Sequence, residues 1–203
     1  MTPFRDAVHE ALAGRPDVIL LDIGGVLTPD PWQALLLTPG RGIADRLALD
    51  PTRVEEIANR LWPHFSLQPR TERDWWEELG RQIDSTIPQD LVRDVEAQLL
   101  RPFNDAHELI EDVRLAGDIG VISDNTAFWY AKQSALLRLE SRTDVSRRYL
   151  SFEFGVSKTS RPVGLFEIAA DRLPDRRVLV LDDREANCDR ARAVGFSALL
   201  VTR

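Results

Sequence analysis

Short apolar runs that end in a polar side chain constrain the fold of this chain more than any other feature of its sequence. The runs and the residues that follow them are residues 18–21 with Asp22, residues 119–122 with Ser123, and residues 178–181 with Asp182, and a fourth run covers residues 197–201. Runs that are apolar throughout are typical of strands covered on both faces, and helical segments separate them, which predicts a doubly wound parallel α/β sheet. Ligands bind at the carboxyl ends of such strands. We therefore expect a site where these polar residues meet.

The stretch from about residue 30 to residue 102 has a different pattern. No strand-like run occurs in it, and its amphipathic periodicity predicts helices over residues 43–49, 51–61, 71–83 and 88–100. Thr71 followed by Asp74 is typical of a helix start. We predict an α/β core domain made of residues 1–29 and 103–203, with a small all-helical cap domain, residues 30–102, inserted after the first strand.

Composition and charge exclude several classes of partner. The net charge of −7 and the pI near 5.1 argue against nucleic acid or an anionic membrane, because both need clustered lysine and arginine. The single cysteine, Cys188, permits no intrachain disulfide, and the first residues hold no long apolar run typical of a signal peptide or membrane span. We expect a cytoplasmic protein, monomer or homodimer, that binds a small anionic substrate at a locally positive site.

Two glycines follow the first strand-end carboxylate. Gly24 and Gly25 come just after Asp22, so the main chain can approach a ligand closely and leave N–H groups free for an anion. Taken alone, this motif is equally well explained by an aspartate that caps an ordinary turn.

Two adjacent carboxylates, Asp182 and Asp183, stand at the tip of another strand. The negative charges of two neighbouring carboxylates repel each other unless a cation lies between them. Ligands that are all oxygen favour a hard metal such as Mg²⁺. The alternative is a solvated acidic turn that caps the helix starting at Ala186.

Four motifs together resemble a known family. They are Asp22-Ile-Gly-Gly-Val-Leu, Val-Ile-Ser123-Asp-Asn, Gly155-Val-Ser-Lys158 and Val-Leu-Asp182-Asp183-Arg-Glu-Ala-Asn187. In this order they resemble the motifs of the haloacid dehalogenase (HAD) superfamily, in the subfamily with a helical cap inserted after the first motif. The resemblance extends from about Val18 to Val201, and it implies a HAD-like, Rossmann-like core.

The resemblance implies a catalytic group and a metal site. Asp22 would be the nucleophile that forms an aspartyl-phosphate, which water then hydrolyses. Ser123 and Lys158 would complete the catalytic set, with Lys158 balancing the negative charge of phosphate and carboxylates. The implied Mg²⁺ ligands are Asp22, the main-chain carbonyl of Gly24, Asp182 and Asp183. The residues expected to hold the phosphate are Gly25, Ser123, Asp124 and Lys158.

Two positions depart from the family pattern. Phosphatases of this superfamily usually carry a second aspartate two residues after the nucleophile, and here that position is Gly24. Asp30 and Asp124 are candidates to replace this general acid and base. The family lysine is commonly followed by proline, whereas three residues separate Lys158 from Pro162, so either Lys158 or Arg161 fills the basic role.

These observations favour one function and leave two alternatives. The first is a Mg²⁺-dependent phosphatase of a small phosphorylated metabolite, with a cap that closes over the substrate. The second is a 2-haloacid dehalogenase-type hydrolase, for which Gly24 is no obstacle but the acidic pair is unexplained. The third is a catalytically impaired HAD domain that binds a phosphorylated ligand or a protein. The identity of the substrate stays open, because selectivity would lie in cap side chains.

Overall fold

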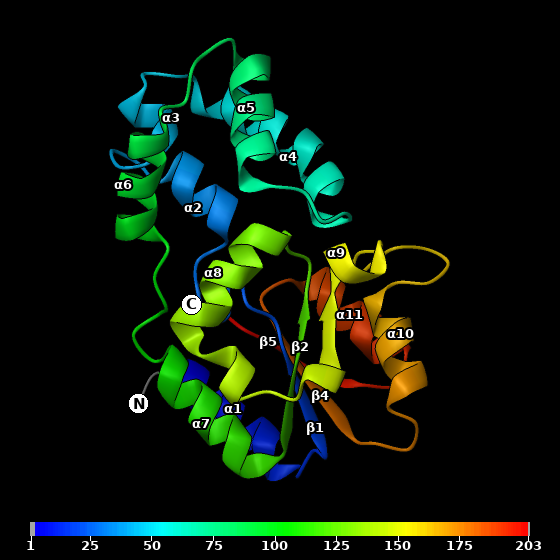
Figure 1. Ribbon diagram of the computed structural model, residues 1–203. Helices are drawn as coiled ribbons and strands as arrows, with labels where there is room; N and C mark the ends of the chain where they lie inside the picture. The colour runs from blue at the N-terminus through cyan, green and yellow to red at the C-terminus, as the bar shows by residue number, and fades with distance from the viewer. Residues whose placement is uncertain (1–2, 203) are drawn as a thin grey trace.

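Five parallel strands form one sheet in the order β3-β2-β1-β4-β5 at the centre of the computed structural model (Figure 1). The strands are β1 (Val18–Leu21), β2 (Asp118–Ser123), β3 (Arg148–Leu150), β4 (Val178–Asp182) and β5 (Ser197–Leu200). The structure describes residues 3–202, so residues 1–2 and 203 of the predicted core domain lie outside it. The predicted parallel sheet is confirmed, with one additional strand, β3, that the sequence did not indicate.

Both faces of the sheet are covered by helices. Ile19 and Leu21 of β1 point into one apolar cluster, and Val18 and Leu20 point into the cluster on the other face. The first face packs against α1 (Pro3–Ala13), α7 (Ala106–Ala116) and α8 (Ala127–Leu137), and the second against α10 (Leu165–Arg172) and α11 (Glu185–Ala193). Burying a side chain of this size stabilises the fold by about 1.5–3 kcal/mol, so every position of β1 is apolar. The doubly wound α/β architecture is confirmed.

The register of the central strands brings their ends to one level. Leu21 of β1 is paired with Val121 of β2 and with Leu181 of β4. The next residue of β1, Asp22, is therefore level with Asp182, and Ser123 lies one position further along β2. The strand ends face the helices at the top of Figure 1.

The segment between β1 and α7 holds helices and no strand. These helices are α2 (Pro31–Leu37), α3 (Ile43–Arg46), α4 (Pro51–Ser66), α5 (Glu72–Ile83) and α6 (Gln89–Leu99), and we call residues 31–99 the helical insertion. It buries an apolar cluster of its own, in which Trp75, Trp76 and Leu79 are almost fully buried. The division of the chain into a core and a cap domain at the predicted boundaries stays a prediction.

Local sequence explains where the longer helices of the insertion begin. Thr71 Oγ1 accepts the N–H of Asp74 at 3.2 Å and the Asp74 carboxylate accepts the N–H of Thr71 at 3.3 Å, as predicted for the start of α5. At the start of α4, the carboxylate of Asp50 accepts the N–H of Thr52 at 3.0 Å. Caps of this kind satisfy N–H groups that have no partner inside the helix.

Short elements connect α8 to β3 and β3 to α10. They are the 3₁₀ turns Leu139–Ser141 and Val145–Arg147 and the single-turn helix α9 (Ser151–Phe154). Among residues 3–202, no helix combines the length and the apolar character needed to cross a membrane.

Candidate active site

Three carboxylates meet at the carboxyl edge of the sheet. Asp22 follows β1 directly, Asp182 ends β4, and Asp183 comes next in the chain. One oxygen from each carboxylate lies within 4.8 Å of the other two. Asp22 is 6% exposed and Asp182 is 0% exposed, so like charges are held together away from water, which costs free energy unless positive charge is also present.

Lys158 supplies positive charge between two of these carboxylates. Its Nζ lies 2.6 Å from Oδ2 of Asp22 and 2.6 Å from Oδ2 of Asp182. The main-chain N–H of Lys158 donates to Oδ1 of Asp124 at 2.8 Å, which fixes the loop that carries it. Arg161, the alternative for the basic role, is exposed. The structure therefore places Lys158, and not Arg161, beside the carboxylates.

Burial and charge determine the pKa values of these groups. Burial raises the pKa of Asp22 to about 7, and the charges of Asp182 and Asp183 add to the increase while Lys158 opposes it. Burial lowers the pKa of Lys158, but Asp182 and Asp22 outweigh it, so the pKa lies above its usual range. Burial and then the charge of Asp182 raise the pKa of Asp183. One ammonium is therefore too little positive charge for three carboxylates, and a further cation would stabilise their charged forms.

Both oxygens of the Asp182 carboxylate accept hydrogen bonds. Its Oδ1 accepts the main-chain N–H of Arg184 at 2.9 Å and Nδ2 of Asn187 at 2.9 Å, while its Oδ2 accepts Nζ of Lys158. By contrast, the Asp183 carboxylate accepts no hydrogen bond from another described residue. Asp183 is therefore the carboxylate with both oxygens free for a metal. Asp22 accepts the N–H of Ile23 on Oδ1 at 2.7 Å and contacts Lys158 through Oδ2, and Asp182 holds Lys158 in position.

Gly25 has a steric role beside Asp183. Its φ of 74° lies in the left-handed region, which glycine adopts readily. A Cβ at this position would overlap the carboxylate of Asp183. The Gly25 N–H donates to the carbonyl of Thr28 at 2.8 Å and is not free for an anion. The glycine makes room for Asp183, and a phosphate contact of Gly25 stays a prediction.

Buried hydrogen bonds hold the loops after β1 and β2 against α8. Gln133 donates from Nε2 to Oγ1 of Thr28 at 2.6 Å, and its Oε1 accepts Nδ2 of Asn125 at 2.8 Å. The N–H of Asn125 donates to Oγ of Ser151 at 2.9 Å. Ser123, at the end of β2, is 1% exposed, and its phosphate-binding role stays a prediction.

A small pocket lies above Asp22 and Lys158. It is lined by Asp22, Gly24, Asp30, Pro31, Trp62, Asp124, Asn125, Lys158, Asp183, Arg184 and Asn187. Its volume of about 30 Å³ is enough for little more than water. Trp62 belongs to α4, so the helical insertion covers the site. Sequence reasoning assigned no role to Trp62 or Arg184. Trp62 lies outside the motifs, and Arg184 lies inside the fourth motif, but only the fold brings its side chain to Asp30.

Asp30 and Arg184 form an ion pair at this pocket, with 3.1 Å between Oδ2 and Nη2. Burial raises the pKa of Asp30 to about 6, with Arg184 opposing the increase and Asp183 adding to it. Burial also raises the pKa of Asp124. Both candidates for the missing general acid thus line the pocket above Asp22.

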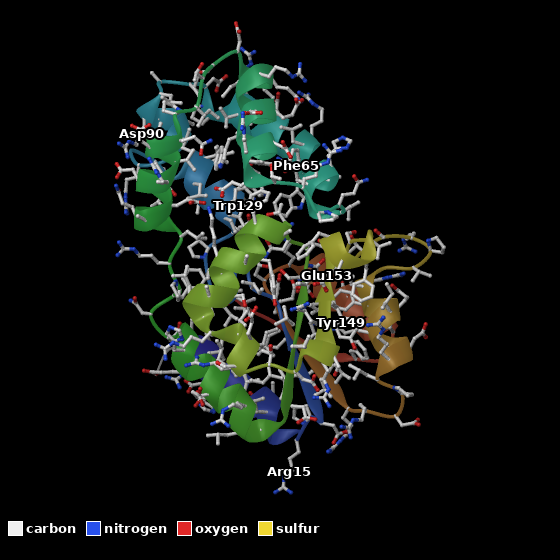
Figure 2. All side chains as sticks on the ribbon, in the orientation of Figure 1. Arg15, Phe65, Asp90, Trp129, Tyr149 and Glu153 are labelled. Carbon is white, nitrogen blue, oxygen red and sulfur yellow. The ribbon has the colours of Figure 1, made fainter. Side chains whose placement is uncertain are left out.

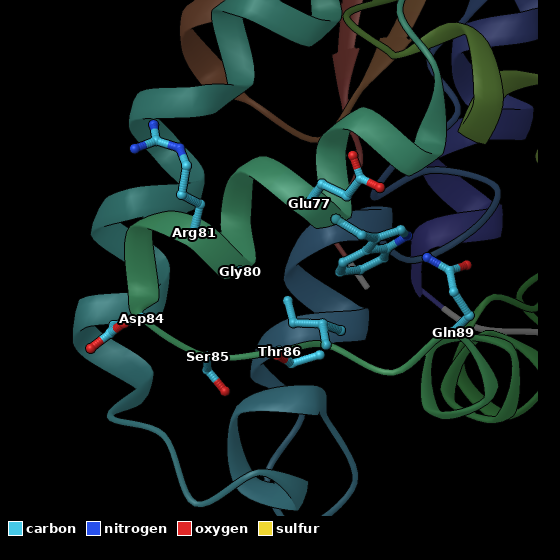
Figure 3. A pocket seen from close by; sticks show the side chains of 9 residues that line it. Glu77, Gly80, Arg81, Asp84, Ser85, Thr86 and Gln89 are labelled. Carbon is cyan, nitrogen blue, oxygen red and sulfur yellow. The ribbon is translucent and has the colours of Figure 1, made fainter.

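A larger hollow lies on the helical insertion, between the end of α5 and the segment that leads to α6 (Figure 3). Its volume is about 500 Å³, and it shares no lining residue with the pocket above Asp22. Arg81, one of its charged residues, is paired with Glu78, which does not line the hollow. The carboxylates and Lys158 therefore mark the smaller pocket as the candidate active site.

Comparisons with known proteins bear on the fold. No protein-family model matches the chain, and no curated protein matches it by sequence. Among solved structures, it is similar to a HAD family enzyme from Bacteroides thetaiotaomicron in complex with magnesium and inorganic phosphate, with a TM-score of 0.66, 16% identity, and 91% of this chain and 93% of that chain covered.

Two further structures extend the comparison. One is the putative HAD-hydrolase YfnB from Bacillus subtilis bound to magnesium, with a TM-score of 0.63, 14% identity, and 92% of this chain and 88% of that chain covered. The other is L-2-haloacid dehalogenase from Xanthobacter autotrophicus, with a TM-score of 0.56, 13% identity, and 93% and 78% covered. At these identities the likeness concerns the fold. The chain has the fold of the haloacid dehalogenase family enzymes.

Proposed function

We propose that this protein is a Mg²⁺-dependent hydrolase that removes phosphate from a small phosphorylated metabolite. The observation that carries the proposal is the cluster of Asp22, Asp182 and Asp183, with one oxygen of each within 4.8 Å of the others and Lys158 among them. Such a cluster has too much negative charge for its single ammonium, and it faces a pocket.

The donor set fits magnesium. All three side chains offer oxygen, the ligand that this hard cation prefers. Asp22 and Asp183 would bind it directly, while the implied contact of the Gly24 carbonyl stays a prediction. When bound, Mg²⁺ supplies positive charge that lets an anionic phosphate approach the carboxylates. The Bacteroides and Bacillus relatives, both crystallised with magnesium, support this choice of metal.

The residues of this chain would divide the reaction into two steps. In the first, a carboxylate oxygen of Asp22 bonds to phosphorus, the bond from phosphorus to the ester oxygen breaks, and the alcohol leaves. In the second, water bonds to phosphorus and the bond between phosphorus and Asp22 breaks, which releases phosphate. Lys158, held by Asp182, stays beside Asp22 and offsets charge in both steps. Ser123 and the main chain after it would bind a phosphoryl oxygen.

Halide displacement from a 2-haloacid is the second candidate function. The similarity of fold to the Xanthobacter dehalogenase supports it. That reaction requires one nucleophilic carboxylate, which leaves the close approach of Asp182 and Asp183 without a purpose. The phosphatase accounts for all three carboxylates and for Lys158.

The test is a panel of phosphate esters assayed with Mg²⁺ or with EDTA, for wild type and for Asp22→Asn. We expect Mg²⁺-dependent phosphate release that Asp22→Asn lowers by about three orders of magnitude or more. Asp171→Asn, an exposed substitution at the end of α10, is the matched control and should retain wild-type activity.

Three results would contradict the proposal. Activity that survives both EDTA and Asp22→Asn would remove its basis. Chloride release from a 2-chloroacid without phosphate release would favour the dehalogenase. Mg²⁺-dependent binding of inorganic phosphate without turnover of any ester would favour the hypothesis of a catalytically impaired domain that binds a phosphorylated ligand or a protein.

A further inference from the structure

Asp30 lies next to the position into which a side chain at residue 24 would project. A Cβ built on Gly24 would lie 3.5 Å from the Cα of Asp30 and 3.8 Å from its Oδ2. Asp30 also lines the pocket above Asp22, together with Gly24. Both distances are those of ordinary contact, so the Asp30 carboxyl group lies directly beside position 24.

The side chain of Asp30 does not cap the helix that follows it, although its position predicts such a cap. It is the residue before α2 and precedes a proline, and Asp50 stands in the same Asp-Pro context before α4. Asp50 accepts the N–H of Thr52 at 3.0 Å, whereas the side chain of Asp30 caps no helix N–H. The carboxyl group of Asp30 therefore lines the pocket and makes no capping hydrogen bond to the helix that it begins.

One oxygen of Asp30 is held and the other is buried without a partner. Oδ2 accepts Nη2 of Arg184 at 3.1 Å. Oδ1 is the only carboxylate oxygen among the described residues that is buried and unpartnered. The main-chain N–H of Gln33 lies close enough to lower the pKa of Asp30. It does not meet the geometry of a hydrogen bond to the Asp30 side chain. A buried polar atom without a partner needs an explanation, and a bound substrate would supply one.

The proposed reaction requires a proton donor at this place. When the bond from phosphorus to the ester oxygen breaks, the electron pair stays on that oxygen, and a proton must reach it to give the alcohol. Among the other carboxyl groups of the pocket, Asp22 forms the new bond, Asp183 is placed for the metal, and Asp124 accepts the N–H of Lys158. Of these carboxyl groups, only Asp30 has an oxygen that is both buried and without a hydrogen-bond partner.

We propose that Asp30 is the catalytic acid that gives its proton to the leaving oxygen. This inference rests on the proposed phosphatase function. After the first step Asp30 is a carboxylate, and it regains a proton from the water that attacks the phosphorus bound to Asp22. Arg184 orients the carboxyl group through Oδ2, so Oδ1 carries the proton.

The test compares two substrates that differ in their need for a proton. Phenyl phosphate has a poor leaving group, whereas 2,4-dinitrophenyl phosphate has a leaving group that departs without protonation. The rate of phenol release in a single turnover with Mg²⁺ reports the first step alone. We expect Asp30→Asn to slow phenyl phosphate by about 10²- to 10⁴-fold and to change 2,4-dinitrophenyl phosphate by only a few fold.

Two further variants separate catalysis from structure. Asp50→Asn, the matched Asp-Pro helix start, should leave both rates unchanged. Asp30→Asn combined with Gly24→Asp adds a carboxyl group directly beside the side chain at position 30, and we expect it to recover part of the phenyl phosphate rate. Wild-type thermal unfolding of Asp30→Asn would show that the variant is folded.

The outcomes are distinct. If Asp30→Asn slows both substrates equally, or slows neither, the role of Asp30 is overturned while the phosphatase assignment stands. If Asp30→Asn fails to fold, the double variant decides through the ratio of its two rates, phenyl phosphate over 2,4-dinitrophenyl phosphate. A ratio within about tenfold of wild type supports the role of a carboxyl group at this place, and a ratio lowered by about 10²- to 10⁴-fold overturns it. If wild type hydrolyses neither ester, the proposed function and this inference both fall.

Discussion

At the scale of single residues, Lys158 is the side chain on which the site most depends. It is 1% exposed and its ammonium lies 2.6 Å from both Asp22 and Asp182. Removing one partner of a buried ion pair leaves uncompensated charge, which typically costs about 3–5 kcal/mol. We expect Lys158→Met to lose stability of this order and to be stabilised by Mg²⁺ more than wild type is, because three carboxylates then lack their ammonium.

Thermal unfolding with and without Mg²⁺ measures this effect. Arg161→Met is the control, since Arg161 is exposed in the same loop, and it should behave as wild type. An equal response of both variants to Mg²⁺ would show that Lys158 does not compensate the carboxylates.

The residues that sequence could predict are those that strand ends bring together. Asp22, Asp182 and Asp183 follow apolar runs, so their shared edge was predictable from the rule for parallel sheets. The steric role of Gly25 was not predictable, because the space that Asp183 needs is visible only in three dimensions. Arg184 was missed, since an arginine after an acidic pair has no signal of its own.

At the scale of elements, an exposed ion pair joins the chain just before β1 to the chain just before β4. The carboxylate of Asp17 accepts the main-chain N–H of Arg177 at 2.9 Å and lies 3.1 Å from its guanidinium. Hydrogen bonds from Arg177 lower the pKa of Asp17 to about 2. A lowered pKa in the folded state stabilises the protein above the unfolded pKa of about 3.9, and this contribution is lost as the pH falls toward 2.

We therefore expect Asp17→Asn to be less stable than wild type near pH 6, by an amount that shrinks between about pH 4 and pH 2. Urea unfolding at several pH values measures the difference. Because the pair is exposed, added salt should reduce the effect. A difference that is constant down to pH 2 would mean that the ionised form of Asp17 contributes nothing.

The elements that sequence failed to indicate are short. β3 covers Arg148–Leu150 at the edge of the sheet, and α2 covers Pro31–Leu37. β3 has three residues, too few to show the alternation of apolar and polar residues typical of a strand. α2 has seven residues, too few to show the 3.6-residue apolar period typical of a helix. Contacts with β2 and with the other helices of the insertion decide these conformations. The capped helix α5, by contrast, begins within one residue of its predicted start.

At the scale of the whole molecule, α8 belongs to two apolar cores. Tyr130 and Leu137 pack on the sheet, whereas Trp129 is buried in the cluster of the helical insertion. Figure 2 shows Trp129 where α8 meets the insertion. Trp62, which covers the pocket, is stacked on Trp129 with 6.1 Å between ring centroids. Docking of the insertion on α8 therefore closes the pocket, and its small volume means that a phosphate ester enters only when this contact loosens.

Lys132 of α8 provides the polar part of this docking. Its Nζ lies 2.7 Å from Glu72 of α5 and 2.7 Å from Glu96 of α6. Burial and the charge of Glu72 raise the pKa of Glu96, and Lys132 opposes them. Without the ammonium the two carboxylates would repel each other across the contact. Hydrogen bonds to charged groups contribute about 1.5–3 kcal/mol each when partly buried, so loss of Lys132 should favour the open arrangement.

We expect Lys132→Met to increase the radius of gyration in X-ray scattering and to speed hydrogen exchange in residues 22–30 and 100–105, the two connections between the insertion and the sheet. A shift of about 1.4 kcal/mol would change exchange through the open form about tenfold. Arg73→Met removes the same charge from a pair with Glu77 inside α5, so it should change neither measurement. Identical exchange in both variants would mean that apolar packing around Trp129, and not the Lys132 contacts, sets how often the pocket opens.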